Sequence, residues 1–339
     1  MPHLAVMGAG GWGTALSIVA ARAGCEVRLW SRNAKVVDEI NRERVNSAYL
    51  APHEIPSSVR ASVDAGEVVS GAEIVILAAP SHATRELLAR LRDLVEPEVV
   101  FVSATKGIEI ETGQRISEIV SEVLDGRPAA RRFVCLSGPS FAQEVAAGQP
   151  TAVVAASVDE TLSRAVQSAL SAPNFRVYTN GDVVGTELGG ASKNVMALAA
   201  GMVSGLGLGT NSVAALVTRG LAEMSRLAIA EGARAETLMG LAGLGDLVLT
   251  CTGSLSRNRY VGQELGRGRS LEEVLAGMSE VAEGVRTARA VQLLAGRAGV
   301  EMPITNEVCA VLYEGKSARA AVESLMSRPP RDEFAGYAV

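Results

Sequence analysis

A lysine in a glycine-containing segment is the first residue in this sequence that could do acid–base chemistry. Lys193 lies in the run Glu187 to Asn194, which reads ELGGASKN. If the run is helical, Glu187, Gly190 and Asn194 share one face and Lys193 lies on its edge. Two consecutive glycines lower helix propensity, so their presence in this run needs a reason. They indicate that another group of the protein or a ligand comes close to the backbone here. Lys193 is therefore a candidate proton donor or acceptor between two halves of the chain. The alternative is a solvated surface lysine after a flexible hinge.

Two further polar clusters follow in a part of the chain that otherwise reads as helical. The first is Gly243 to Leu247, with the sequence GLGDL, which contains Asp246 and is followed by Thr250. The second is the run Ser254 to Arg259, with the sequence SLSRNR, in which Arg257 stands between Ser256 and Asn258. An arginine can hold phosphate through two parallel hydrogen bonds, and the serine and asparagine beside it can add others. A helix start with a surface arginine would explain the second cluster equally well.

A glycine-rich motif near the start of the chain indicates a nucleotide cofactor. The pattern G-x-G-x-x-G runs from Gly8 to Gly13. Gly8 permits a tight turn, Gly10 lets a pyrophosphate approach the backbone, and Gly13 lets a helix pack closely on a strand. The helix start adds N–H donors and partial positive charge. The motif requires a strand, a helix and a second strand around it, and these are expected at Leu4–Met7, Thr14–Ala23 and Val27–Trp30.

The residues after the second strand bear on the choice of dinucleotide. An acidic residue there would bond the ribose 2′-hydroxyl of NAD, but the chain has Ser31-Arg32-Asn33. Arg32 could pair with the 2′-phosphate of NADP and stack on its adenine. We therefore expect NADPH to be accepted, with NADH as an alternative. The other reading of Arg32 is an ordinary surface arginine.

Further strands extend the predicted sheet to about residue 180. Lys106 follows one of them in Thr105-Lys106-Gly107. Because ligands of open α/β sheets lie outside the carboxyl ends of the strands, Lys106 is expected near substrate or nicotinamide. Its alternative is a solvated lysine in a turn. The turn Ser137 to Glu144 opens a helix and can also bring N–H groups to a ligand. These strands are expected at Glu73–Ala79, Val99–Ser103, Phe133–Leu136, Thr151–Ala156 and Phe175–Tyr178.

The pattern predicts an α/β protein with an N-terminal Rossmann-like, doubly wound sheet and an all-α C-terminal domain. We place the dinucleotide-binding domain at residues 1–181, the helical substrate-binding domain at 182–328 and a flexible tail at 329–339. Residues 40–55 are expected to form an irregular loop. In the helical part, Ser270 to Glu273 is a capping box. Later helices are expected at Thr287–Arg297, Glu307–Tyr313 and Ala318–Met326.

Composition argues against several classes of function. The chain has 339 residues, of which 48% are hydrophobic and 20% charged, as in a compact soluble protein. Its net charge of -5 argues against nucleic acid or an anionic membrane as the main partner. We find no apolar run of membrane-spanning length and no signal peptide. The 4 cysteines lie far apart, as in a reduced cytoplasmic enzyme, and we expect no metal site. Cys251 could instead be read as a nucleophile.

Taken together, these segments resemble bacterial NAD(P)-dependent glycerol-3-phosphate dehydrogenases. The chain departs from that family at Ser192, where leucine is usual, and we expect this to affect helix packing and not chemistry. The family is usually dimeric and supplies glycerol 3-phosphate for phospholipid synthesis, so the resemblance implies a homodimer with that task. The matching stretches keep the family's order over nearly the whole chain: Gly8–Thr14, Ala104–Gly107, Ser137–Glu144, Glu187–Asn194, Gly243–Asn258 and Val281–Gly284.

The resemblance also implies roles for individual residues. Lys193 matches the family's proton-transfer residue. The positions that match substrate contacts are Lys106, Gly138, Ser140, Lys193, Asp246, Ser256, Arg257 and Asn258. The positions expected around the cofactor are Gly8, Gly10, Gly11, Trp12, Gly13, Arg32, Lys106, Ala142, Arg257, Val281 and Glu283.

The implied reaction is the reduction of dihydroxyacetone phosphate, a phosphorylated triose, to sn-glycerol 3-phosphate by hydride transfer from NADPH or NADH. Lys193 would donate the proton and Lys106 would polarise the carbonyl. Asp246 would orient Lys193 or bond a substrate hydroxyl, while Arg257 with Asn258 would hold the phosphate. One rival is a β-hydroxyacid or 6-phosphogluconate-type dehydrogenase, which lacks the second-half polar clusters. Another is a regulatory protein that binds NADPH without turnover, for which the glycine loop would suffice.

Overall fold

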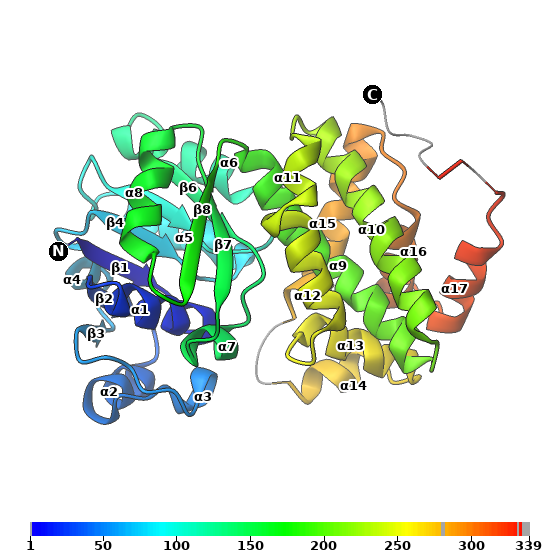
Figure 1. Cartoon of the computed structure of the whole chain (residues 1–339), viewed down its shortest axis with the longest axis horizontal. Helices are drawn as coiled ribbons and strands as arrows, with labels where there is room; N and C mark the ends of the chain where they lie inside the picture. Colours follow the sequence, from blue (N-terminus) through cyan, green and yellow to red (C-terminus); the bar gives the residue numbers. More distant parts are fainter. Residues whose placement is uncertain (1, 279–281, 331, 334–339) are drawn as a thin grey trace. The chain divides into compact units, whose positions relative to one another are not determined.

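The computed structural model describes residues 2–278, 282–330 and 332–333. The chain forms two compact units (Figure 1). The first comprises Met1–Lys106 and Gln114–Thr186, and the second comprises Gly107–Gly113 and Glu187–Val339. The division expected after residue 181 stays a prediction, and most of the expected tail lies outside the described residues. Within the described part of the chain, no helix is long and apolar enough to cross a membrane.

The first unit is built on a sheet whose described strands number eight, in the order β3-β2-β1-β4-β5-β6-β7-β8. This confirms the predicted doubly wound α/β sheet and its extension to Asn180. Predicted strand ends differ from the observed ones by a residue or two. The strands are β1 (His3–Met7), β2 (Glu26–Trp30), β3 (Val59–Ser62), β4 (Ile74–Leu77), β5 (Val100–Ser103), β6 (Phe133–Ser137), β7 (Thr151–Ala156) and β8 (Phe175–Asn180).

Strands β6 and β7 are antiparallel, whereas the other neighbouring strands of the sheet are parallel. The sequence pattern suggested helical crossovers throughout. A parallel partner would require the connection to travel back along the whole strand. The helix in this connection is α7 (Ala142–Ala146), whose five residues cover only about 7 Å. The chain therefore turns back and runs beside β6 in the opposite direction.

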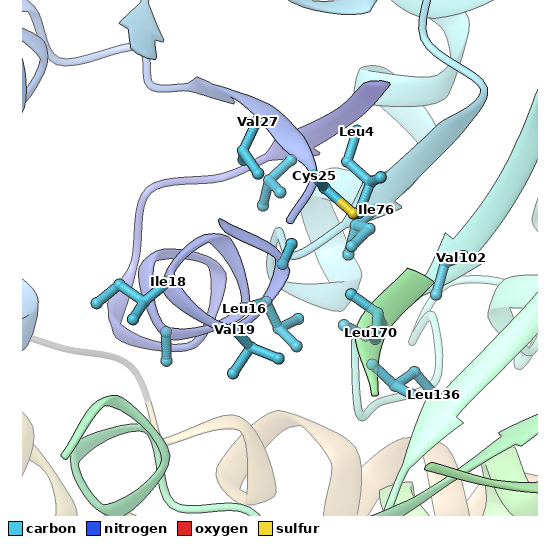
Figure 2. Packing of buried hydrophobic residues seen from close by; sticks show 14 of the residues in the cluster. Leu4, Leu16, Ile18, Val19, Cys25, Val27, Ile76, Val102, Leu136 and Leu170 are labelled. Carbon is cyan, nitrogen blue, oxygen red and sulfur yellow. The ribbon is translucent and has the colours of Figure 1, made fainter. Parts of the chain in front are cut away.

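Helices cover both faces of the sheet because side chains alternate along each strand. In β1, Leu4 and Val6 belong to one buried cluster, whereas Ala5 and Met7 belong to the other. Figure 2 shows part of the first cluster, to which Leu16 and Val19 of α1 contribute together with Leu4 and Ile76 of the sheet. The first face is covered by α1 (Gly11–Arg22) and α8 (Glu160–Leu170), the second by α4 (Ala65–Val69), α5 (Ser81–Leu91) and α6 (Ile116–Val123).

The expectation of an irregular loop over residues 40–55 holds for residues 44–46 and 51–55 and is wrong for the rest. The chain there contains the end of α2 (Ala34–Glu43) and the short α3 (Ser47–Leu50). Helix α2 starts at an Asn33 cap whose side-chain oxygen accepts a bond from the Lys35 N–H. Strand β3, which follows, is short and lies at the sheet edge, so its sequence signal is weak.

The second unit is helical, and its described residues contain no strand. The predicted capping box is confirmed, because Ser270 and Glu273 each accept a hydrogen bond from the other's N–H. Helix α16 starts earlier than predicted because Pro303 suits the first helical position. The elements are α9 (Val183–Gly205, from Glu187 on in this unit), α10 (Thr210–Ala230), α11 (Ala235–Met239), the π-helix η2 (Leu241–Gly245), α12 (Asp246–Thr252), α13 (Arg257–Gly266), α14 (Leu271–Ala276), α15 (Glu283–Ala298), α16 (Pro303–Tyr313) and α17 (Ala318–Met326).

Glycines let α9 and α13 pack backbone against backbone. A Cβ at Gly201 of α9 would lie 2.1 Å from the Arg259 carbonyl oxygen. A Cβ at Gly262 of α13 would lie 1.9 Å from the carbonyl oxygen of Leu198. Side chains at either position would force the helices apart. This contact holds the start of α13 beside the segment of α9 that carries Lys193.

A buried carboxylate joins α10 to α16. Glu223 is 2% exposed and accepts hydrogen bonds from the N–H groups of Ile304 and Thr305, at 2.6 and 3.2 Å. These N–H groups belong to the first turn of α16, where a helix has no internal acceptors for them. Burial raises the pKa of Glu223 to about 7, and it outweighs these hydrogen bonds, which favour the charged form.

We predict that the free energy of unfolding falls as pH rises from about 4.5 to about 7. The folded state binds a proton at Glu223 in this range and the unfolded state does not, so raising the pH favours unfolding. The expected loss is roughly 3 kcal/mol. The free energy of unfolding is measured by urea unfolding at several pH values, for the parent and for Glu223→Gln. The variant keeps a carbonyl acceptor but cannot titrate, so it should not show this loss. If both proteins show the same pH dependence, Glu223 does not titrate in this way.

Candidate active site

The predicted glycine loop lies where the strand order of the sheet reverses. Strand β1 lies between β2 and β4, and such a switch point is where ligands of doubly wound sheets bind. Gly8 has a φ of +131°, and a Cβ there would lie 2.8 Å from the carbonyl oxygen of Ala78, just after β4. A Cβ at Gly13 would lie 1.9 Å from the Gly8 carbonyl oxygen. The tight turn and close packing assigned to these glycines are therefore present.

The start of α1 has the features that a dinucleotide pyrophosphate needs. Gly10 is the N-cap, and no described side chain caps the helix there. A Cβ added to Gly10 would meet no described atom within 4 Å, so the backbone is open for close approach. The Trp12 indole N–H is buried and has no hydrogen-bond partner among the described residues. The residues therefore fit a nicotinamide dinucleotide whose phosphates accept bonds from the helix N–H groups.

Asn46 supports this loop and was missed by the sequence analysis. Its side chain is fully buried, and its amide donates hydrogen bonds to the Ala9 carbonyl and the Thr14 hydroxyl, both at 2.9 Å. Gly11 is closely covered as well, since a Cβ there would lie 2.9 Å from the Tyr49 carbonyl oxygen. An asparagine before a short helix carries no sequence signal for such a distant contact.

Arg32 follows β2 and is exposed at the start of the α2 region. The side chain of the preceding residue makes a local contact, since the Ser31 hydroxyl accepts a hydrogen bond from the Asn33 N–H at 3.2 Å. No carboxylate stands in the sequence Ser31-Arg32-Asn33 where NAD-specific chains carry one. The contact of Arg32 with a 2′-phosphate stays a prediction.

Three predicted substrate residues meet at the carboxyl ends of β5 and β6. The Lys106 ammonium donates to the Gly138 carbonyl at 2.8 Å and to the Ser140 hydroxyl at 3.3 Å. Gly138 has a φ of +133°, which a residue with a side chain rarely adopts. Ala142 begins α7, and its Cβ lies 3.7 Å from the Cβ position of Gly11. The Lys106 ammonium is thus held by two acceptors of the fold, which argues against the alternative of a solvated lysine in a turn.

Lys193 is buried in the second unit and paired with Asp246. Their side chains are 7% and 1% exposed, and the ammonium donates to Asp246 Oδ1 at 2.6 Å. It also donates to the Thr250 hydroxyl at 2.8 Å. Thr250 in turn donates to the Asp246 carbonyl oxygen, so its lone pairs face the lysine. The alternative of a solvated surface lysine is wrong.

Gly189, one of the two glycines before Lys193, has the close backbone neighbour that the sequence predicts for this segment. A Cβ at Gly189 would lie 2.6 Å from the Ala242 carbonyl oxygen in η2. The π-helix η2 leads directly into α12, whose first residue is Asp246. Close packing of η2 on α9 therefore brings the carboxylate to the lysine. Short π-helical segments such as η2 are frequent at functional sites.

The predicted phosphate cluster forms the start of α13. Ser256 is the N-cap, and its hydroxyl accepts the Arg259 N–H at 3.2 Å. Arg257 is exposed at the first helical position. Asn258 is buried, and its carboxamide bonds Asn194 and Gly284. Glu283 begins α15. Val281, the remaining predicted cofactor contact, lies outside the described residues, and all these ligand contacts stay predictions.

Cys251 is poorly suited to act as a nucleophile. It is 1% exposed in α12, and burial raises the pKa of its thiol to about 12. The reactive form of cysteine is the thiolate, which is scarce at neutral pH with such a pKa. Cys251 is therefore a small core residue beside the ion pair of Lys193 and Asp246.

Comparisons with known proteins agree with one another. Family models described as the N-terminus and the C-terminus of NAD-dependent glycerol-3-phosphate dehydrogenase match residues 3–163 and 182–323. The chain is 54% identical to a glycerol-3-phosphate dehydrogenase [NAD(P)+] of Koribacter versatilis over 98% of this chain and 99% of that one. For the same enzyme of Geobacter sulfurreducens the identity is 52%, with 98% of each chain covered. A glycerol-3-phosphate dehydrogenase structure from Coxiella burnetii matches with a TM-score of 0.92 and 40% identity, covering 96% of this chain and 99% of that one.

The buried ion pair generates a stability prediction. Asp246→Ala leaves the Lys193 ammonium buried without its carboxylate, so we expect a loss of about 3–5 kcal/mol in the free energy of unfolding. The double variant Asp246→Ala with Lys193→Met removes both charges and should recover most of that loss. Urea unfolding of the two variants and the parent measures this. A double variant no more stable than Asp246→Ala would show that the unpaired charge is not the cause.

Proposed function

The chain belongs to the NAD-dependent glycerol-3-phosphate dehydrogenase family, and we propose that it interconverts dihydroxyacetone phosphate and sn-glycerol 3-phosphate with NAD(P)H. The observation that carries the proposal is the buried lysine of the second unit. Lys193 is held by Asp246 and Thr250 at hydrogen-bond distance. A cation is costly to bury and is retained where its proton or charge is used. Ketone reduction needs such a proton donor.

The first unit is proposed to hold the cofactor. When bound there, a reduced nicotinamide would supply the hydride for C2 of the substrate. The start of α1 would bind the pyrophosphate through its N–H groups, with Gly10 leaving the backbone accessible and Trp12 offering its indole N–H. Ala142 and Glu283 would lie along the dinucleotide. Asn46 keeps the loop in shape through its bonds to Ala9 and Thr14.

Lys193 is proposed to give its proton to the C2 oxygen as hydride arrives at C2, and to accept it back in the reverse direction. Asp246 and Thr250 fix the direction of the ammonium because they accept two of its bonds. Lys106 would stabilise negative charge developing on the same oxygen. Its position is set by Gly138 and Ser140. The chain's own groups thus position the substrate, supply the proton and screen the charge.

The substrate phosphate is proposed to bind at the start of α13. Arg257 occupies the first helical position, and the first turn of this helix contains no acidic residue. Helix N–H groups and the guanidinium together favour a dianion there. Ser256 shapes this end of the helix through its cap bond. The same features do not suit the uncharged end of a simple hydroxyacid.

We propose that NADPH and NADH are both accepted, because Arg32 is exposed after β2 and no carboxylate accompanies it. A homodimer and a role in supplying glycerol 3-phosphate for phospholipids follow from the resemblance. A cytoplasmic location is supported by the cysteines, which are all described and buried and form no disulfide with one another.

The proposal predicts that reduced-nicotinamide absorbance falls when dihydroxyacetone phosphate is added to the protein. The assay is run separately with NADPH and NADH, and the ratio of the rates for the parent and Arg32→Ala reports the role of that arginine. Loss of the arginine should lower the rate with NADPH more than the rate with NADH, because only NADPH carries the 2′-phosphate. Cofactor binding without oxidation on this substrate would reject the proposed activity.

A further inference from the structure

A buried chain of hydrogen bonds crosses three helices of the second unit. The Asn258 side-chain amide in α13 donates to Asn194 Oδ1 in α9 at 3.0 Å. The side-chain oxygen of Asn258 accepts the backbone N–H of Gly284 in α15 at 2.9 Å. Asn194 is 5% exposed and Asn258 is 8% exposed. One carboxamide therefore ties together segments that are far apart in the sequence.

The bond to Gly284 completes the start of α15. The N-cap of this helix is Ala282, and no side chain of the described residues caps it locally. The first N–H groups of a helix have no partners within the helix. Gly284 is one of these first residues, and Asn258 supplies the acceptor from another helix. Asn258 therefore determines where α15 begins relative to α13.

The contact leaves little room for adjustment. A Cβ at Gly284 would lie 2.7 Å from the Asn194 carbonyl oxygen and 2.8 Å from Asn258 Oδ1. At position 258 the side chain must offer a donor to one neighbour and an acceptor to the other. Asparagine does both, whereas aspartate lacks the donor. The contact thus favours a carboxamide side chain at position 258.

Each member of this chain stands next to a residue with a proposed role in the reaction. Asn194 follows Lys193, Asn258 follows Arg257, and Gly284 follows Glu283. Those three residues are proposed to serve proton transfer, the substrate phosphate and the cofactor.

We propose that Asn258 is a positioning residue that sets the cofactor-contacting start of α15 relative to the phosphate and proton-transfer groups. The inference rests on the proposed function. It assigns Asn258 an effect on NADPH affinity, which a side chain that merely contacted substrate phosphate would not have. Asn258 would affect NADPH affinity because its bond to the Gly284 N–H fixes the position of the preceding residue, Glu283.

The test measures the dissociation constant of NADPH without substrate, by nucleotide fluorescence, and the KM for dihydroxyacetone phosphate. Asn258→Ala should weaken NADPH binding roughly ten-fold and raise KM, since the Gly284 N–H loses its buried acceptor. Asn258→Asp keeps that acceptor, so NADPH affinity should return close to that of the parent. Its KM should stay raised, because it cannot donate to Asn194 and places negative charge beside Arg257.

Asn306→Ala is the matched control. It removes another asparagine that bonds across helices, to Gln292 at 3.0 Å, and it should leave both quantities unchanged. If Asn258→Ala does not fold, Asn258→Ser replaces it, because a hydroxyl is too short to bridge the two partners. Unchanged NADPH affinity in the Ala or Ser variant, or equal weakening in Asn258→Asp, would overturn the inference. Turnover of the parent on dihydroxyacetone phosphate tests the proposed function separately.

Discussion

The chemistry proposed for the second unit depends on keeping one ammonium group buried. Lys193 lies in the interior, where an unpaired charge would cost several kcal/mol. Asp246 compensates the charge of the ammonium. The Thr250 hydroxyl accepts a further hydrogen bond from it, because that hydroxyl donates its own hydrogen bond to the backbone carbonyl of Asp246. The pair contributes little to stability over a well-packed apolar alternative. Its retention is explained by chemistry, since a held ammonium can deliver a proton in a defined direction.

Close backbone contacts position this pair and the groups around it. Helix η2 can approach α9 because Gly189 has no side chain, and α13 can approach α9 because Gly201 and Gly262 have none. In the first unit, Gly8 and Gly13 allow the same kind of contact between β1, β4 and α1. Glycine is costly in regular structure. Its use at these places indicates that short backbone distances are what set the positions of the polar groups.

Much of the fold was predictable from local sequence. The glycine motif, its flanking strands and the all-helical second half follow from patterns within some ten to thirty residues. Helix α2 and strand β3 were missed because one is short and charged and the other is a four-residue edge strand. The antiparallel pairing of β6 with β7 is a property of the connection's geometry, which residue patterns do not state.

For the candidate site too, the sequence predicts individual residues but not the contacts between them. Lys193, Asp246 and Lys106 were singled out by residue type and place, but the pairing of Lys193 with Asp246 joins positions 53 residues apart. The support of the glycine loop by Asn46 and of α15 by Asn258 is also long-range. Single asparagines occur in turns and helix starts throughout proteins, so their type alone carries no such information. These contacts become visible only in the folded chain.

The most direct test of the account is steady-state turnover of Lys193→Ala on dihydroxyacetone phosphate, with NADPH binding measured in parallel. Circular dichroism at the assay temperature establishes that the variant is folded. The account predicts a fall in kcat of roughly 10²–10⁴-fold, while the KM for substrate and the affinity for NADPH change little. A kcat close to that of the parent would contradict it, because the buried lysine would then not supply the proton.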